Sequence, residues 1–345
     1  MKKSLTVFIS AFAVPYIILC LFVFLIDPYY VFHAPLFEME PINHNAHYIA
    51  RGLIRNMDYD MLICGTSMCE NMHTDYVDTV FDCKSIKVVQ HGSYSRDLAA
   101  SLKQAARSGK AQTVIMGLDS NVWKKPSDGY RIEDIPQYAV STPTVINTAS
   151  YLFNIASLEP CVKLIKTNWN KEMIPMNDWW TISEDSYSQE NVANAWRETK
   201  NAGNGLSEAN EKLAWENYNN LTEGIEACAE KGILIKFFIP PYSMADLAFY
   251  DYGYALDVNK EIWRELLQYD NVELYAVQFD TDLIQHFEWY RNKNHYNGLV
   301  SDMIIDDIAD KRFLLTPDNI DREVDTFKQF LDGYDWEGLE ASFAE

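Results

Sequence analysis

The sequence predicts an α/β fold, a three-layer sandwich in which helices cover both faces of a five-stranded parallel sheet. Short apolar segments alternate with segments of helical spacing, and the first apolar segment resembles a strand buried on both faces. The expected strands are residues 59–64, 86–90, 113–117, 233–239 and 272–277. The expected helices include residues 68–81, 97–109, 207–231 and 298–312. Ligands of such sheets gather at the carboxyl ends of the strands.

The chain is expected to have four parts. Residues 1–27 form a cytoplasmic start and a transmembrane anchor, and residues 28–57 form a connector. Residues 58–315 carry the α/β domain with an aromatic-rich insertion at about 120–206, and residues 316–345 form an acidic helical extension. The tryptophans of the insertion either stack on sugar rings or form a local core; they are Trp123, Trp169, Trp179, Trp180 and Trp196.

The N-terminal segment predicts a location at the cell membrane. Residues 5–26 contain no charged side chain, and at about 1.5 Å per residue they suffice to cross roughly 30 Å of hydrocarbon. The bulky residues that follow argue against a cleaved signal peptide. Lys2 and Lys3 favour a cytoplasmic N-terminus and an extracellular C-terminal domain. The lipid bilayer is therefore an expected partner through this single helix.

Composition excludes several functions. A formal net charge of -21 makes a nucleic-acid partner implausible, because a phosphate backbone requires a basic surface. The six cysteines show no metal or redox spacing, and the chain has neither a P-loop nor a dinucleotide fingerprint. We therefore expect no metal and no cofactor.

Ser67 is the first candidate for chemistry. It follows the first expected strand and a Gly65-Thr66 turn, at the start of the helix expected over residues 68–81. Free backbone N–H groups and the helix dipole would favour an oxyanion there. The alternative is that Ser67 only caps this helix, because serine is a favoured N-cap residue.

Three further blocks follow in order. Gly92 lies in Gln-His-Gly-Ser-Tyr-Ser at the end of the second strand, and Asp119 follows the third strand in Gly-Leu-Asp-Ser. Asn292 and His295 lie in Asn-Lys-Asn-His-Tyr-Asn, before the last helix of the domain. Histidine is the usual base that activates a serine hydroxyl.

The order of the four blocks resembles the SGNH/GDSL hydrolase superfamily over about residues 58–312. The resemblance is to the membrane-anchored bacterial branch that includes the teichoic acid D-alanyl transfer protein and polysaccharide O-acetyl enzymes. It implies a flavodoxin-like SGNH fold, with Ser67 as nucleophile and His295 as base. It also implies an oxyanion hole formed by the N–H groups of Ser67 and Gly92 and by an asparagine side chain of the third block.

Two positions depart from the superfamily pattern. Asp119 stands where the oxyanion asparagine is expected, so we consider Asn121 as the amide donor. Asn292 stands where an aspartate orients the histidine, and in a related triad this change costs about 10⁴ in turnover. Either another acid such as Asp302 or Asp306 serves His295, or serine and histidine act as a dyad, or the site is degenerate.

The resemblance predicts a membrane-anchored extracytoplasmic serine esterase or acyltransferase acting on O-acyl groups of a cell-envelope polysaccharide. The expected partners are an envelope glycan or acylated carbohydrate and a membrane partner in polymer export or acyl transfer. One alternative is a catalytically degenerate relative that binds or scaffolds envelope-polymer assembly. Another is a structural surface protein in which Ser67 and His295 never meet.

Overall fold

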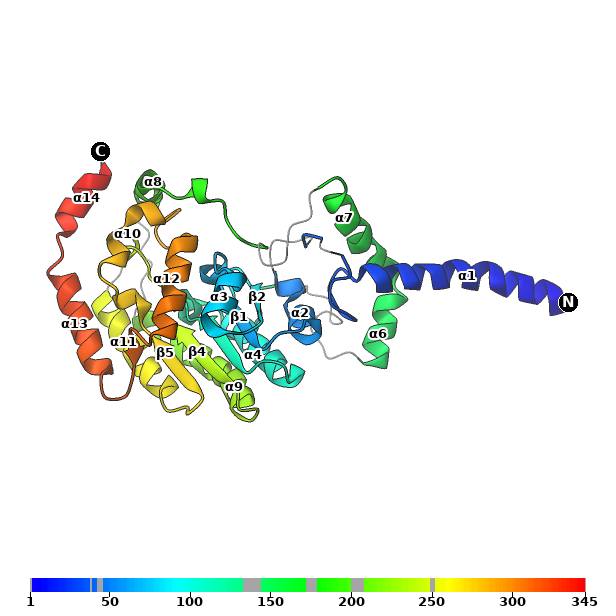
Figure 1. Ribbon diagram of the computed structural model, residues 1–345, viewed down its shortest axis with the longest axis horizontal. Helices are drawn as coiled ribbons and strands as arrows, with labels where there is room; N and C mark the ends of the chain where they lie inside the picture. The colour runs from blue at the N-terminus through cyan, green and yellow to red at the C-terminus, as the bar shows by residue number, and fades with distance from the viewer. Residues whose placement is uncertain are drawn as a thin grey trace. The chain divides into compact units, whose positions relative to one another are not determined.

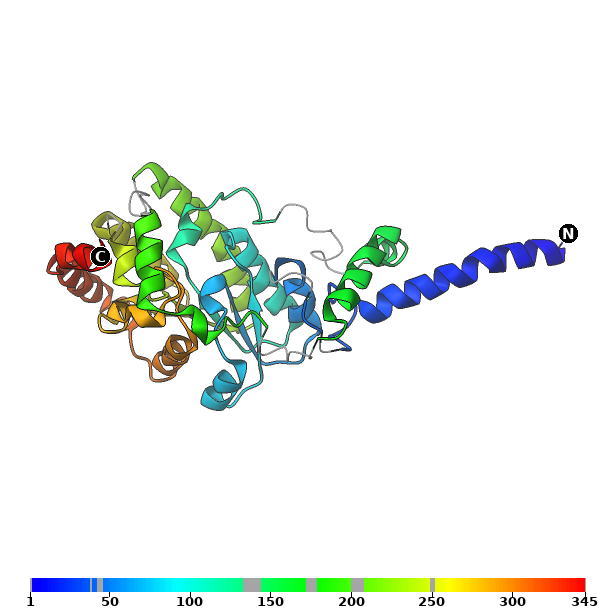
Figure 2. The same cartoon turned by 90° about the horizontal axis from the view of Figure 1, so that it is seen from above.

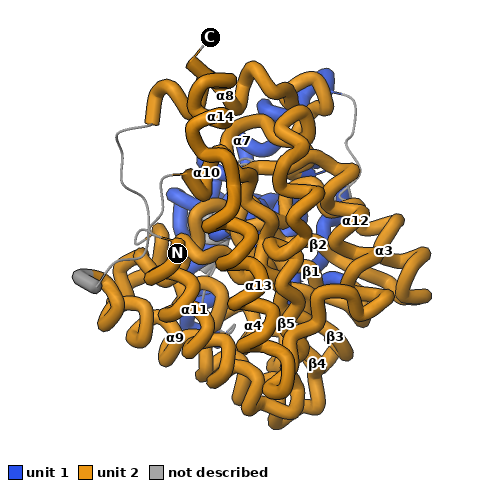
Figure 3. Tube along the Cα trace, turned by 90° about the vertical axis from the view of Figure 1, so that its left-hand side faces the viewer, with its two compact units in different colours: residues 1–57, 134–179 blue, residues 58–133, 180–345 orange. Residues whose placement is uncertain are grey.

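The computed structural model describes residues 2–37, 39–41, 46–132, 144–171, 179–199, 208–248 and 252–344. The chain forms two compact units (Figure 3): unit 1 comprises residues 1–57 and 134–179, and unit 2 comprises residues 58–133 and 180–345. The predicted insertion at about 120–206 is thus divided between the units, and residues 316–345 belong to unit 2.

Unit 2 is built on a six-stranded sheet with the order β2-β1-β3-β4-β5-β6. The first five strands are parallel and β6 is antiparallel to β5. The strands are β1 (Met61–Gly65), β2 (Ser85–Val89), β3 (Thr113–Gly117), β4 (Leu234–Phe238), β5 (Val272–Tyr275) and β6 (Leu314–Leu315). The five predicted parallel strands are confirmed within two residues at each end. The sheet is nevertheless mixed, because β6 has two residues and leaves no periodic signal.

Helices cover both faces of the sheet in unit 2. α4 (Ser95–Ser108) packs against α9 (Glu208–Ala229), and α3 (Thr74–Phe81) packs against α12 (Gly298–Ala309). Figures 1 and 2 show these two helix pairs on opposite sides of the strands. At the α4–α9 contact a Cβ on Gly224 would lie 2.9 Å from Leu102 Cβ, so only glycine allows this approach. The predicted α/β layering is confirmed.

Further helices complete unit 2. They are α8 (Gln189–Thr199), α10 (Met244–Leu247), α11 (Tyr252–Leu266), α13 (Ile320–Asp332) and α14 (Trp336–Ala344). Its short 3₁₀ helices are η2 (Ser67–Cys69), η3 (Ser120–Lys124), η6 (Glu184–Ser186), η7 (Val277–Phe279), η8 (Leu283–Gln285) and η9 (Phe287–Trp289). α13 packs on α11, and α14 packs on α8. The C-terminal residues are therefore attached to the domain through buried side chains such as Phe327 and Phe343.

Unit 1 contains α1 (Lys2–Ile26), η1 (Ala46–Tyr48), α2 (Ala50–Asn56), α6 (Val145–Leu152), η4 (Ile155–Ser157) and α7 (Leu158–Asn168). Its core joins the end of α1 to α6 and α7 through Val23, Tyr151 and Cys161. Within the described residues, no helix meets both the length and the apolarity needed to span a membrane. The span expected at residues 5–26 therefore stays a prediction.

Candidate functional site

A sharp turn after β1 presents Ser67. A Cβ on Gly65 would lie 2.8 Å from Cys69 Sγ and 3.2 Å from the Gly117 nitrogen, so the chain passes here only as glycine. The next residues form η2, whose N-cap is Thr66; its hydroxyl oxygen accepts a hydrogen bond from the Met68 N–H. Ser67 is therefore the first residue of a 3₁₀ turn.

This geometry corrects two expectations. The helix expected over residues 68–81 begins only at Thr74, because η2 and a short connection precede it. The interpretation of Ser67 as a helix cap is wrong, because Thr66 caps η2 and His73 occupies the N-cap position of α3. The Ser67 hydroxyl is left available for another partner.

That partner is His295. The Ser67 Oγ lies 2.7 Å from His295 Nε2, although the two residues are 228 positions apart. The structure thus brings together the two residues that the sequence singled out, one after β1 and one just before α12. The alternative in which serine and histidine never meet is wrong.

A closed loop holds His295 in place. Tyr290 and Tyr296 form an isolated antiparallel bridge, and the Arg291 N–H donates to the His295 carbonyl oxygen at 2.9 Å. The Ser243 N–H donates to the Lys293 carbonyl oxygen at 3.1 Å. The backbone of this loop is therefore held in place on both sides of His295.

Asn292 fixes the tautomer of His295. Its Oδ1 accepts from the backbone N–H groups of Asn294 and His295, at 3.1 and 3.0 Å, which identifies this atom as the amide oxygen. The same oxygen lies 3.1 Å from His295 Nδ1. Since an amide oxygen can only accept, Nδ1 carries the proton and Nε2 presents a lone pair to Ser67. Asn292 therefore selects the tautomer that a general base requires.

A buried carboxylate lies beside the imidazole. Glu70 is buried and pairs with Arg291 Nη2 at 2.8 Å and with His91 Nε2 at 3.0 Å. Burial lowers the pKa of His295, while the charge of Glu70 raises it. The histidine is thus held neutral at rest, with a negative charge near enough to favour its protonated form during a reaction.

The two acids suggested as partners of His295 contact other residues. Asp302 Oδ1 lies 3.0 Å from His73 Nδ1, and Asp306 Oδ1 accepts a hydrogen bond from the Tyr76 hydroxyl. That interpretation is wrong, because both carboxylates point to α3 and its N-terminal end. Glu70 had no signal of its own in the sequence, since its partners belong to distant loops.

Two backbone donors suit an oxyanion. Within the described residues, the N–H groups of Ser67 and Gly92 make no hydrogen bond. Gly92 has a φ of +65°, a left-handed conformation that favours glycine. Both residues follow adjacent parallel strands, β1 and β2, so their N–H groups lie at the same end of the sheet, where the strands finish.

Asp119 and Asn121 form a separate cluster. Asp119 accepts from the Asn121 N–H at 2.8 Å, from the Thr66 hydroxyl at 3.3 Å and from the Tyr242 hydroxyl. The Asn121 amide nitrogen in turn donates to the Tyr242 oxygen at 3.2 Å. Asp119 therefore accepts hydrogen bonds and holds the turn before Ser67 through Thr66. A carboxylate in this role does not donate a hydrogen bond to an oxyanion.

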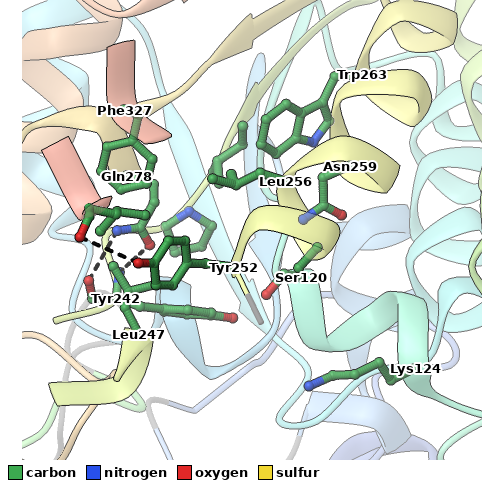
Figure 4. Close-up of a pocket in the computed structure, with 14 residues that line it drawn as sticks. Ser120, Lys124, Tyr242, Leu247, Tyr252, Leu256, Asn259, Trp263, Gln278 and Phe327 are labelled. Carbon is green, nitrogen blue, oxygen red and sulfur yellow. Dashed lines mark hydrogen bonds between the residues drawn. The ribbon is translucent and has the colours of Figure 1, made fainter. Parts of the chain in front are cut away.

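An apolar pocket lies behind Tyr242 (Figure 4). Its cavity volume is about 60 Å³, and it lies between α11, α13 and the residues that follow β3, β4 and β5. Trp263, Leu256 and Phe327 are among its lining residues, and Gln278 holds the backbone of Tyr242.

Most tryptophans of the expected insertion, and Cys69, have structural positions in the described part of the chain. Trp123, Trp179, Trp180 and Trp196 are buried, so they form local cores and are not a sugar-stacking face; only Trp169 of this set is exposed. Burial raises the pKa of the Cys69 thiol to about 12, so this neighbour of Ser67 is not a thiolate nucleophile.

Comparison of the chain with models of known protein families finds no match, and comparison with curated protein sequences finds none either.

The buried neutral state of His295 predicts a pH dependence of stability. Because burial lowers its pKa, the unfolded chain takes up a proton below the ordinary value of 6.5 while the folded chain does not. The free energy of unfolding should therefore fall as the pH drops below 6.5, until the folded pKa is reached. Urea titrations at several pH values should show this loss, and it should be smaller in His295→Gln. Parallel curves for the two proteins would contradict the assignment.

Proposed function

We propose that this chain is a serine hydrolase or acyltransferase of the SGNH/GDSL type, with Ser67 as nucleophile and His295 as base. One observation carries the proposal: the Ser67 hydroxyl lies 2.7 Å from a histidine nitrogen whose lone pair is fixed toward it by Asn292. A hydroxyl within hydrogen-bond reach of a neutral, oriented imidazole is the arrangement that nucleophilic catalysis needs.

The reaction begins when Ser67 Oγ attacks the carbonyl carbon of an ester. His295 Nε2 takes the hydroxyl proton as the new C–O bond forms, and the N–H groups of Ser67 and Gly92 bind the developing oxyanion. The intermediate collapses as the ester C–O bond breaks, and His295 returns the proton to the leaving alcohol oxygen. Water or a glycan hydroxyl then attacks the acyl-serine and loses its proton to His295. The bond between the acyl carbon and Ser67 Oγ breaks, His295 returns the proton to Ser67 Oγ, and the acyl group leaves on the attacking oxygen.

Asn292 and Glu70 divide the task that one aspartate performs in the superfamily pattern. Asn292 orients the ring through its amide oxygen but brings no charge. Glu70 supplies the negative charge without touching the ring, since its oxygens face Arg291 and His91. This division supports an active site that works without the usual aspartate.

The proposed location is the outer face of the cell membrane. Residues 5–26 lack charge and follow Lys2 and Lys3, which supports a single-pass anchor with a cytoplasmic N-terminus. The proposed substrate is the O-acyl group of a cell-envelope polysaccharide, as the resemblance to the anchored bacterial branch implies. No cofactor enters this mechanism.

Ser67→Ala should abolish labelling by a fluorophosphonate, because the probe reacts with a serine that a neighbouring base activates. Gel fluorescence of the full-length protein measures the labelling. The control variant Ser183→Ala replaces an exposed serine of unit 2, and it should be labelled as strongly as the wild type. Undiminished labelling of Ser67→Ala would refute the nucleophile. A wild-type protein that is not labelled by the probe but still binds acylated glycan would favour the non-catalytic alternative.

Glu70→Gln should lower kcat/KM for an acetyl ester and move the acidic limb of the pH profile to lower pH. The variant removes a charge that raises the pKa of His295 and stabilises its protonated form. We expect a loss of about tenfold, which corresponds to about 1.4 kcal/mol. Asp302→Asn is the matched control, because that carboxylate faces His73. An unmoved limb in Glu70→Gln would show that its charge does not reach the imidazole.

Deleting residues 5–26 should make the chain extractable from the membrane fraction of expressing cells by alkaline carbonate, because it removes the proposed spanning anchor. A phosphatase fused to the C-terminus of the full chain should be active, since this enzyme matures only outside the cytoplasm. A full chain found in the soluble fraction, or an inactive fusion alongside an active exported control, would overturn the proposed location.

A further inference from the structure

The exposed apolar side chains of this protein gather in unit 1. Among the described residues, only two of the exposed large hydrophobic side chains, Tyr130 and Leu299, belong to unit 2. Val145, Ile146 and Ile155 of unit 1 are 88%, 79% and 72% exposed. Scattered apolar residues are normal on a protein surface, but a concentration of this kind marks a contact surface.

Three helices contribute to this concentration. α6 and α7 both contact α1, and Figure 1 shows one on each side of it. The Tyr16 hydroxyl donates to the Phe153 carbonyl oxygen at 2.9 Å, and their rings stack with centroids 5.6 Å apart. The turn after α6 is therefore fastened to the middle of α1. We call the exposed apolar side chains of α1, α6 and this turn the apolar surface of unit 1.

The polarity of this surface suits a medium without water. α6 carries no charged residue, and neither do residues 5–26. The Asn147 N–H donates to Thr144 Oγ1 at 3.1 Å, and the Ala156 N–H donates to Asn154 Oδ1 at 3.0 Å. These two N–H groups are the capping bonds of α6 and of the 3₁₀ turn that follows it.

The edge of this surface has the composition of a membrane interface. On α7, the exposed Lys163 and Lys166 lie near Val162, which is 40% exposed, and Trp169, which is 71% exposed, follows the helix. Long cationic side chains reach headgroups while their stems stay in apolar surroundings, and tryptophan is enriched at the same depth.

We propose that the apolar surface of unit 1 is seated in a lipid bilayer, with α6 and α7 at the interface beside α1. The proposal rests on the membrane location given above, but it adds a second contact, formed by residues 144–169 and independent of whether α1 crosses the bilayer. Such a contact would limit the rotation of unit 1 about the axis of α1, which a single helix cannot do.

Depth-dependent quenching tests this contact in the full chain. Cys20 and Cys83, the two cysteines that are not buried, are first replaced by serine. Single cysteines at Ile146, Ile155, Ile18 and Leu299 then carry a nitrobenzoxadiazole fluorophore. All four side chains are exposed, so the labels should not disturb a core. The protein is reconstituted into vesicles of phosphatidylethanolamine and phosphatidylglycerol with nitroxide groups on the acyl chains.

The labels at Ile146 and Ile155 should lose most of their emission to the nitroxides, and the label at Leu299, on α12, should keep it. Quenching at Ile18 alone would overturn the proposal and leave the α1 anchor intact. Unquenched emission at all four positions would overturn both the contact and the membrane location. Circular dichroism of each labelled protein verifies that the fold is retained.

Discussion

The candidate site depends on one acceptor atom, Asn292 Oδ1. Three N–H groups converge on it, two from the backbone of its own loop and one from the His295 ring. The two backbone donors fix which atom of the amide is the oxygen, and the oxygen then fixes which ring nitrogen carries the proton. In the 2.7 Å hydrogen bond between them, Ser67 Oγ is therefore the donor and His295 Nε2 is the acceptor. Without this atom the imidazole would lose both its tautomer and its orientation.

The elements around this atom are tied to one another by buried polar contacts. Glu70 follows the serine turn, while its partners Arg291 and His91 lie next to Asn292 and Gly92. One buried carboxylate therefore connects the turn that carries Ser67, the loop that carries His295 and the turn that carries Gly92. Breaking a buried ion pair leaves an uncompensated charge, so this connection resists separation of the three loops.

Unit 1 differs from unit 2 in its surface chemistry. Unit 2 keeps its large apolar side chains inside, with few exceptions among the described residues, whereas unit 1 exposes them on α1 and near α6. The two units therefore suit different surroundings, an aqueous one for the proposed chemistry and a lipid one for attachment. An enzyme that acts on a polymer made at the membrane gains from this combination, because attachment limits the distance to its substrate.

The sequence by itself determined the five parallel strands and the Gly65 turn, because local apolar runs and a strand-end glycine encode them. The contact between Ser67 and His295 was expected only from the resemblance in the order of the motifs, and the tertiary structure brings the two together. The sequence did not determine β6, whose two residues are too few to show the alternating pattern of a strand, or the start of α3, which η2 precedes. Only the tertiary structure decided the role of Asn292 and the partners of Glu70, Asp119 and Asp302. Those depend on which loops meet at the sheet edge, and contacts between residues hundreds of positions apart leave no local pattern.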